Sequence, residues 1–120
     1  MFGHIANQVS AKRAQLWADR IDLDGLVRFF NEKHPEKTAA NVAALTEYPV
    51  ATVRKWLSRE VVPNGIAITV LYLTYGPELL HAVVRGAPDW LSATVRDREL
   101  AAHRATLAAT REKIERLERA

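Results

Sequence analysis

The residues of this sequence that could do chemistry are cations on one short stretch. Arg54, Lys55 and Arg59 lie close together, and no acidic residue precedes Glu60 on this stretch after Pro49. Guanidinium and ammonium groups donate hydrogen bonds to phosphate, and arginine also makes paired hydrogen bonds to guanine in the major groove of DNA. The stretch therefore favours contact with a polyanion over bond-making chemistry.

The same stretch predicts a helix with a packed face opposite the cations. Val53, Trp56 and Leu57 recur at the spacing of one helical side. Pro49 suits the first turn of such a helix, because its missing N–H would have no partner there. We therefore expect a helix over residues 49–59 whose outer face stays free.

The usual signatures of catalysis and metal binding are missing from the sequence. There is no cysteine, so disulfides, thiolate zinc sites and a cysteine nucleophile are excluded. No two of the four histidines stand three or four residues apart, and no glycine-rich phosphate loop or serine nucleophile motif is present. Asp22 and Asp24 are interpreted as helix caps. We therefore expect no enzyme, no catalytic residue, no metal and no cofactor.

The composition is that of one globular domain with a modest core. The chain has 120 residues, of which 48% are hydrophobic, and its formal net charge is +3. This mildly basic balance permits nucleic-acid binding but does not require it. No apolar run reaches the roughly 18 residues of a membrane helix, and the first residues lack the pattern of a signal peptide. We expect a cytoplasmic protein without membrane contact.

Helical periodicity, interrupted by proline and glycine, predicts an all-α fold. A first amphipathic helix is expected over residues 2–18. A second begins after Asp22 or Asp24 and ends near His34, because the following proline disfavours helix at the residue before it.

The third helix is expected over residues 38–46 and forms a pair with the helix at 49–59. Thr38 is its predicted cap, and Val42 and Leu45 are predicted to face inward.

Three further helices follow this pair. Residues 65–75 are strongly apolar and end at Gly76, and Pro77 opens the next helix, which closes at Gly86. From Asp89 to the end there is neither glycine nor proline, so one helix of about 30 residues is possible. The domain division follows from these elements: an N-terminal helix at 1–22, a central domain at 23–86 and a C-terminal helix at 88–120.

The central segment resembles a known family of DNA-binding domains. The stretch TAANVAALTEYPVATVRKW is similar to the helix-turn-helix of bacterial and phage transcriptional regulators. Trp56 is then followed by Pro63 and by NGIAITVLYLTYG, an arrangement that resembles the Cro/CI-type, or phage λ-repressor-like, domain over about residues 23–84. The resemblance implies a five-helix domain that binds duplex DNA, here with an extra N-terminal helix and a long C-terminal helix.

Three positions differ from the family pattern. Glu47 stands in the turn where the family usually has glycine, and Thr46 stands where it usually has leucine. Arg59 occupies another position at which glycine is frequent. These differences all fall at the ends of the paired helices.

The resemblance and the helix pattern together give a set of candidate contact residues. We expect the helix at 49–59 to enter the major groove and to read bases with Val50, Ala51, Thr52, Arg54 and Lys55. Phosphates are expected to be held by Lys37, Thr38, Ser58, Arg59 and Asn64. For Val50 the alternative is packing against Tyr48 or the fifth helix, and for the polar residues it is an ordinary solvated surface.

The C-terminal helix carries a sparse heptad pattern. Leu100, Leu107 and Ile114 recur every seven residues, which places His103, Thr110 and Leu117 at the second seam position. We expect this helix, residues 89–119, to form a homodimer contact. The alternative is a single helix that folds back on the N-terminal helix.

These observations favour a small prokaryotic or phage transcriptional regulator that binds double-stranded DNA sequence-specifically. One alternative is an accessory DNA-binding protein of a phage or plasmid, acting in packaging, excision or partition. Another is a protein-interaction module or inhibitor that uses the helix-turn-helix as a scaffold, since fold does not determine function. The modest net charge is the main argument for this last alternative.

Overall fold

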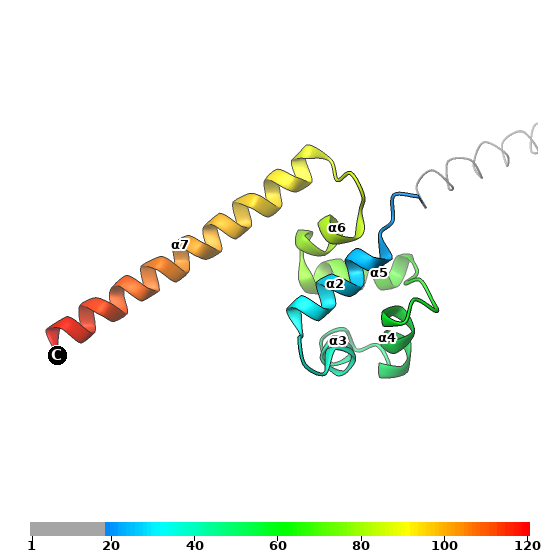
Figure 1. Ribbon diagram of the computed structural model, residues 1–120, viewed down its shortest axis with the longest axis horizontal. Helices are drawn as coiled ribbons and strands as arrows, with labels where there is room; N and C mark the ends of the chain where they lie inside the picture. The colour runs from blue at the N-terminus through cyan, green and yellow to red at the C-terminus, as the bar shows by residue number, and fades with distance from the viewer. Residues whose placement is uncertain (1–18) are drawn as a thin grey trace, which may run out of the picture. The chain divides into compact units, whose positions relative to one another are not determined.

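The computed structural model describes residues 19–120, and this part of the chain is all-α (Figure 1). Its helices, in chain order, are α2 (Leu23–Lys33), α3 (Thr38–Thr46), α4 (Val50–Leu57), α5 (Gly65–Tyr75), α6 (Pro77–Val83) and α7 (Asp89–Arg119). The helix predicted at residues 2–18 lies outside the described residues. The chain divides into two compact units with the boundary between Ala87 and Pro88. We call residues 19–87 the five-helix unit and describe α7 by itself.

The core of the five-helix unit receives side chains from all five of its helices. The fully buried side chains with the largest volumes are Phe30, Leu26, Leu71, Leu79, Val42 and Val53. Removing a side chain of this size from water contributes about 1.5–3 kcal/mol. Helices of 7–11 residues are unstable alone, so this shared core is what keeps them folded.

Helix α2 begins where the sequence predicts, and one of its two candidate caps does the capping. The Asp22 carboxylate accepts a hydrogen bond from the Gly25 N–H at 3.0 Å. Asp24 was expected to share this role, but it lies inside the first turn and instead accepts a hydrogen bond from Arg59 Nε. The prediction for Asp24 is wrong because Asp22 occupies the N-cap position, while the Asp24 carboxylate is engaged by Arg59.

The second half of α2 is fixed to α5 by aromatic side chains. Phe29 meets the Tyr75 ring edge-on, with 5.4 Å between ring centroids, and His34 Nε2 lies 3.0 Å from the Tyr75 hydroxyl oxygen. Burial raises the pKa of the Tyr75 hydroxyl above its ordinary value. The tyrosine therefore joins the C-terminal ends of these two helices.

The five-helix unit is closed by a close approach of α2 to α6. A Cβ atom on Gly25 would lie 2.0 Å from the Ala82 carbonyl oxygen, so only glycine fits at this crossing. Just before α2, an isolated antiparallel bridge pairs Ile21 with Val84. The Asp22 N–H donates to the Val83 carbonyl at 2.6 Å as part of this pairing.

Helix α3 has the predicted bounds but a different start and a different inner face. Its N-cap is Lys37 in the left-handed conformation (φ 51°), without a side-chain cap. Thr38, the predicted cap, is the first helical residue, and its hydroxyl donates to the His34 carbonyl at 2.6 Å. The side chains buried on α3 are Val42, Ala43 and Thr46. Leu45 is 55% exposed, so its predicted inward position is wrong.

Helix α5 also has the predicted bounds, but only part of its apolar surface is buried. Ala67 and Leu71 are buried, whereas Ile66 and Leu73 are about three quarters exposed, at 73% and 76%. The two exposed residues are seven positions apart and therefore lie on one side of the helix. This leaves an apolar stripe on the surface of the five-helix unit.

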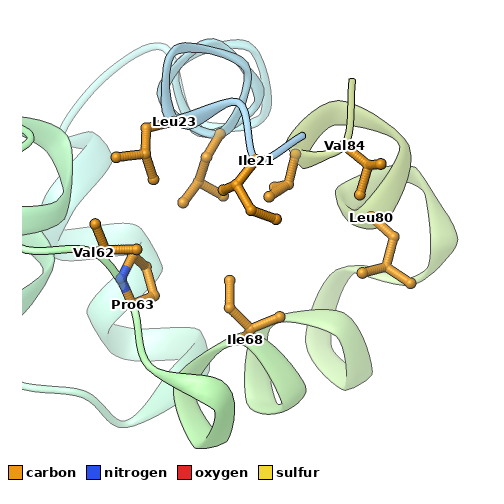
Figure 2. Close-up of a pocket in the computed structure, with 9 residues that line it drawn as sticks. Ile21, Leu23, Val62, Pro63, Ile68, Leu80 and Val84 are labelled. Carbon is orange, nitrogen blue, oxygen red and sulfur yellow. The ribbon is translucent and has the colours of Figure 1, made fainter. Parts of the chain in front are cut away.

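An apolar cavity of about 140 Å³ lies between α2, α5, α6 and the segment that joins α4 to α5 (Figure 2). Leu23, Pro63, Ile68 and Leu80 are among the side chains that surround it, and the lining is almost entirely hydrocarbon. None of the candidate contact residues lines this cavity.

Helix α7 extends without interruption from Asp89 to Arg119, in agreement with the predicted long C-terminal helix. Its heptad residues are exposed: Leu100 by 46%, Leu107 by 50%, Ile114 by 49% and Leu117 by 69%. Within residues 19–120, no helix has the length and apolar content needed to cross a membrane.

Candidate functional site

The candidate site is built on α3, α4 and the turn between them. The turn consists of Glu47, Tyr48 and Pro49. Glu47 adopts the left-handed conformation (φ 63°, ψ 13°), and its N–H ends α3 by donating to the Ala43 carbonyl at 2.9 Å. Pro49 is the N-cap of α4, one residue before the first-turn position predicted for it. A single left-handed residue thus redirects the chain from one helix into the next.

The inner face of α4 is the predicted one. Val53 and Trp56 are buried, and Leu57 is partly buried against the same core. The Trp56 ring packs on Tyr48 with 5.1 Å between ring centroids, so the turn is joined to the helix that follows it. Val50 is also partly buried against the core, which favours the packing alternative for this residue over a free position in a groove.

The outer face of α4 carries small side chains at its start and cations at its end. Ala51, Arg54, Lys55 and Ser58 are exposed, and Thr52 is half-buried. Neither Arg54 nor Lys55 makes an ion pair with another described residue. Cations in the last turn of a helix also interact favourably with its dipole, a stabilising role that needs no partner molecule.

Some of the candidate phosphate contacts already use their side chains in hydrogen bonds within the chain, and others do not. Lys37 is exposed at the start of α3. The Thr38 hydroxyl donates a hydrogen bond to the His34 carbonyl. The Asn64 side chain caps α5 by accepting a hydrogen bond from the Ala67 N–H at 2.9 Å. Ser58 Oγ donates to the Lys55 carbonyl at 3.2 Å.

Arg59 has a partner that its sequence position does not suggest. Its Nε donates to Asp24 on α2, which lies 35 positions earlier in the sequence. Both side chains are largely exposed, so the pair is worth roughly 0–1 kcal/mol. Arg59 is also left-handed (φ 64°), and α4 ends at Leu57, two residues before the predicted end.

The electrostatic surroundings of the site are balanced rather than strongly positive. Lysines plus arginines equal aspartates plus glutamates in number within residues 19–87. Glu47, which precedes α4 in the sequence, and Glu60, which follows it, are both exposed. Attraction to a polyanion would therefore have to come from the local arrangement of Arg54 and Lys55, not from net charge.

The sequence had already suggested the Thr38 backbone N–H, at the start of α3, as a phosphate contact, whereas the backbone donors at the start of α4 were not predicted. Neither α3 nor α4 has a side-chain cap, so the first N–H groups of both helices are free to bind other acceptors. The signal was present, since Lys37 and Pro49 stand at positions where serine, threonine, aspartate or asparagine would cap. Within residues 19–120, no cluster of three or more potential metal-binding side chains is found.

No family model, curated protein or solved structure matches the chain.

Proposed function

We propose that this chain binds duplex DNA sequence-specifically through a helix-turn-helix formed by α3 and α4, as a small transcriptional regulator of a prokaryote or phage. The observation that carries the proposal is the left-handed backbone at Glu47 and Arg59. These are two positions at which the λ-repressor-like family frequently has glycine, the residue that adopts this conformation without strain. At both positions this chain has another residue in the left-handed conformation that glycine adopts easily. This supports a backbone path like that of the family at the ends of the two helices.

In this proposal α4 enters the major groove with its outer face. Arg54 donates two hydrogen bonds to guanine O6 and N7, and Lys55 contacts a base edge or a phosphate. Ala51 and the methyl group of Thr52 meet thymine methyl groups. Val50 contributes less than the sequence predicts, because part of its surface is already packed against the core.

Phosphates are held mainly by backbone N–H groups at the start of α3, together with the exposed Lys37. A helix N-terminus attracts anions because its first N–H groups lack partners inside the helix. Arg59 can join them by exchanging Asp24 for a phosphate, since an exposed ion pair holds it only weakly. Asn64 and Ser58 stay with their intramolecular partners.

The balanced charge of the five-helix unit predicts a shallow salt dependence. Each neutralised phosphate contributes about −0.9 to the slope of log K against log salt. With Lys37, Lys55 and Arg59 as the cations on phosphate, we expect a slope of about −3 per bound unit.

The proposal is tested by fluorescence anisotropy on duplexes selected from a random pool at low salt. Arg54→Ala with Lys55→Ala should weaken binding by at least about tenfold, because one good paired contact to a base is worth roughly 1–3 kcal/mol. Arg116→Ala with Arg119→Ala removes the same charge from the far end of α7 and should leave binding nearly unchanged. A wild-type chain without affinity for any duplex at low salt would contradict the proposal.

A second candidate function is favoured by a separate observation. The exposed Ile66 and Leu73 form an apolar stripe on α5, and exposed apolar surface of this kind often marks a protein interface. A protein-interaction module remains the proposal if duplex binding is absent. Binding to all duplexes alike would instead favour an accessory role in packaging, excision or partition.

A further inference from the structure

The apolar side chains of the second half of α7 are exposed although the helix is long and continuous. Leu100, Leu107, Ile114 and Leu117 are each 46–69% exposed. All four lie on one side of the helix, because they fall at the first and fourth positions of successive heptads. A helix with so sparse a stripe is marginal in water unless another surface covers the stripe.

We propose that a second copy of this chain covers the stripe, in a parallel, in-register, two-stranded coiled coil over residues 99–118. The first heptad position holds Leu100, Leu107 and Ile114. The fourth holds His103, Thr110 and Leu117. This inference goes beyond DNA binding and does not depend on it.

The charges beside the seam match a parallel partner. In a parallel pair, the residue before each first position faces a residue five positions later on the other helix. Glu99 therefore faces Arg104 of the other chain, and Lys113 faces Glu118 of the other chain. Each pair occurs twice by symmetry, and both are of opposite charge.

An antiparallel pair would place like charges together. In an antiparallel pair, the helix edge that carries Arg104 and Arg111 lies beside the same edge of the other chain, so that arginines face arginines. The antiparallel pair would also set each polar seam residue, His103 or Thr110, opposite an apolar one. The parallel arrangement keeps leucine with leucine and threonine with threonine, which is why we select it.

The seam is short, and its centre is polar. His103 and Thr110 occupy positions where leucine would stabilise a dimer best, so monomer and dimer should exchange with concentration. His103→Leu should therefore strengthen association.

Sedimentation equilibrium of the full chain, without DNA, tests the proposal. Wild type should show a monomer–dimer equilibrium, and Leu107→Lys should abolish it. Ala105→Lys, a change of the same kind on the side away from the seam, should leave it intact. Circular dichroism at 222 nm on each variant checks that α7 remains helical.

A charge exchange tests orientation and register. Lys113→Glu places two glutamates opposite each other and should weaken the dimer on the order of tenfold. Adding Glu118→Lys should restore most of the affinity, because the pair across the parallel seam is then of opposite charge again.

Each outcome decides one part of the proposal. A wild-type chain that is monomeric at every concentration overturns the proposal, as does a dimer that survives Leu107→Lys. A dimer in which the exchanged pair fails to recover overturns the parallel register. Loss of duplex binding alone would count only against the DNA-binding proposal, since these measurements contain no DNA.

Discussion

The five-helix unit and α7 differ in how much of their helical surface is buried. Helices α2 to α6 have 7–11 residues each, and each buries side chains in one shared core. Helix α7 has 31 residues, and from Leu100 onward all of its residues are exposed. The first region is therefore specified by packing among its own helices, whereas the apolar stripe of the second is exposed and, in our proposal, is covered by a second copy of the chain.

Gly25→Ala should have the largest effect and should separate the two regions. The added Cβ would clash with the Ala82 carbonyl oxygen. To relieve the clash, α2 and α6 would have to move apart, and this would open the core between them. We expect a loss of about 3 kcal/mol in the free energy of unfolding of the five-helix unit. Urea unfolding followed by circular dichroism measures it, and the helical signal of α7 should not change.

Gly65→Ala is the matched control for this prediction. A Cβ at Gly65 meets nothing within 4 Å, so the free energy of unfolding should change by only a few tenths of a kcal/mol. Equal losses in the two variants would show that the close crossing of α2 and α6 is not what limits this unit.

Glu47→Gly should stabilise the five-helix unit by about 1 kcal/mol. The residue is left-handed, a conformation that is unfavourable for side chains with a Cβ and easy for glycine. Glu47→Gln removes the same charge but keeps the strain, so its stability in urea should equal that of wild type. A gain with glutamine as large as that with glycine would assign the effect to charge instead.

Val84→Ile should stabilise the five-helix unit by about 0.5–1 kcal/mol. Val84 lines the apolar cavity, and the added methyl group fills part of it (Figure 2). Val61→Ile adds the same group at an exposed position outside the cavity and should bring no gain in thermal unfolding experiments.

Alkaline pH should weaken the five-helix unit and not α7. Burial raises the pKa of Tyr75 above 10.0 in the folded state, while the unfolded chain ionises near that value. The unfolded state therefore releases its proton first, and stability falls as the pH rises above about 10. Tyr75→Phe should reduce this pH-dependent loss in urea titrations between pH 9 and pH 11. An unchanged slope would mean that the hydroxyl ionises equally easily in both states.

The sequence predicted the helices well because their ends carry local signals. Proline and glycine bracket α5 and α6, and the bounds of α3 and α5 agree with those expected. The inner face of α4 was predicted from spacing alone, because Val53 and Trp56 are apolar and stand three residues apart, on one side of a helix. These features depend on a few neighbouring residues, which a sequence shows directly.

The candidate site was less predictable because it depends on contacts between distant residues. The pairing of Arg59 with Asp24 joins positions 35 apart, and no local pattern indicates it. Leu45 was expected inside because it is apolar, but the packed side of α3 is the one with Ala43 and Thr46. Which side of a short helix is covered is decided by where the next helix crosses it.

The antiparallel bridge between Ile21 and Val84 brings the two ends of the five-helix unit side by side. The Arg85 N–H donates to the Arg20 carbonyl at 2.6 Å, so the chain enters and leaves this unit at one place. A unit of this kind is a suitable insert: it can be placed within a surface loop of another protein without separating the ends of that loop. It can also be circularly permuted by joining its ends with a short linker and opening a turn elsewhere.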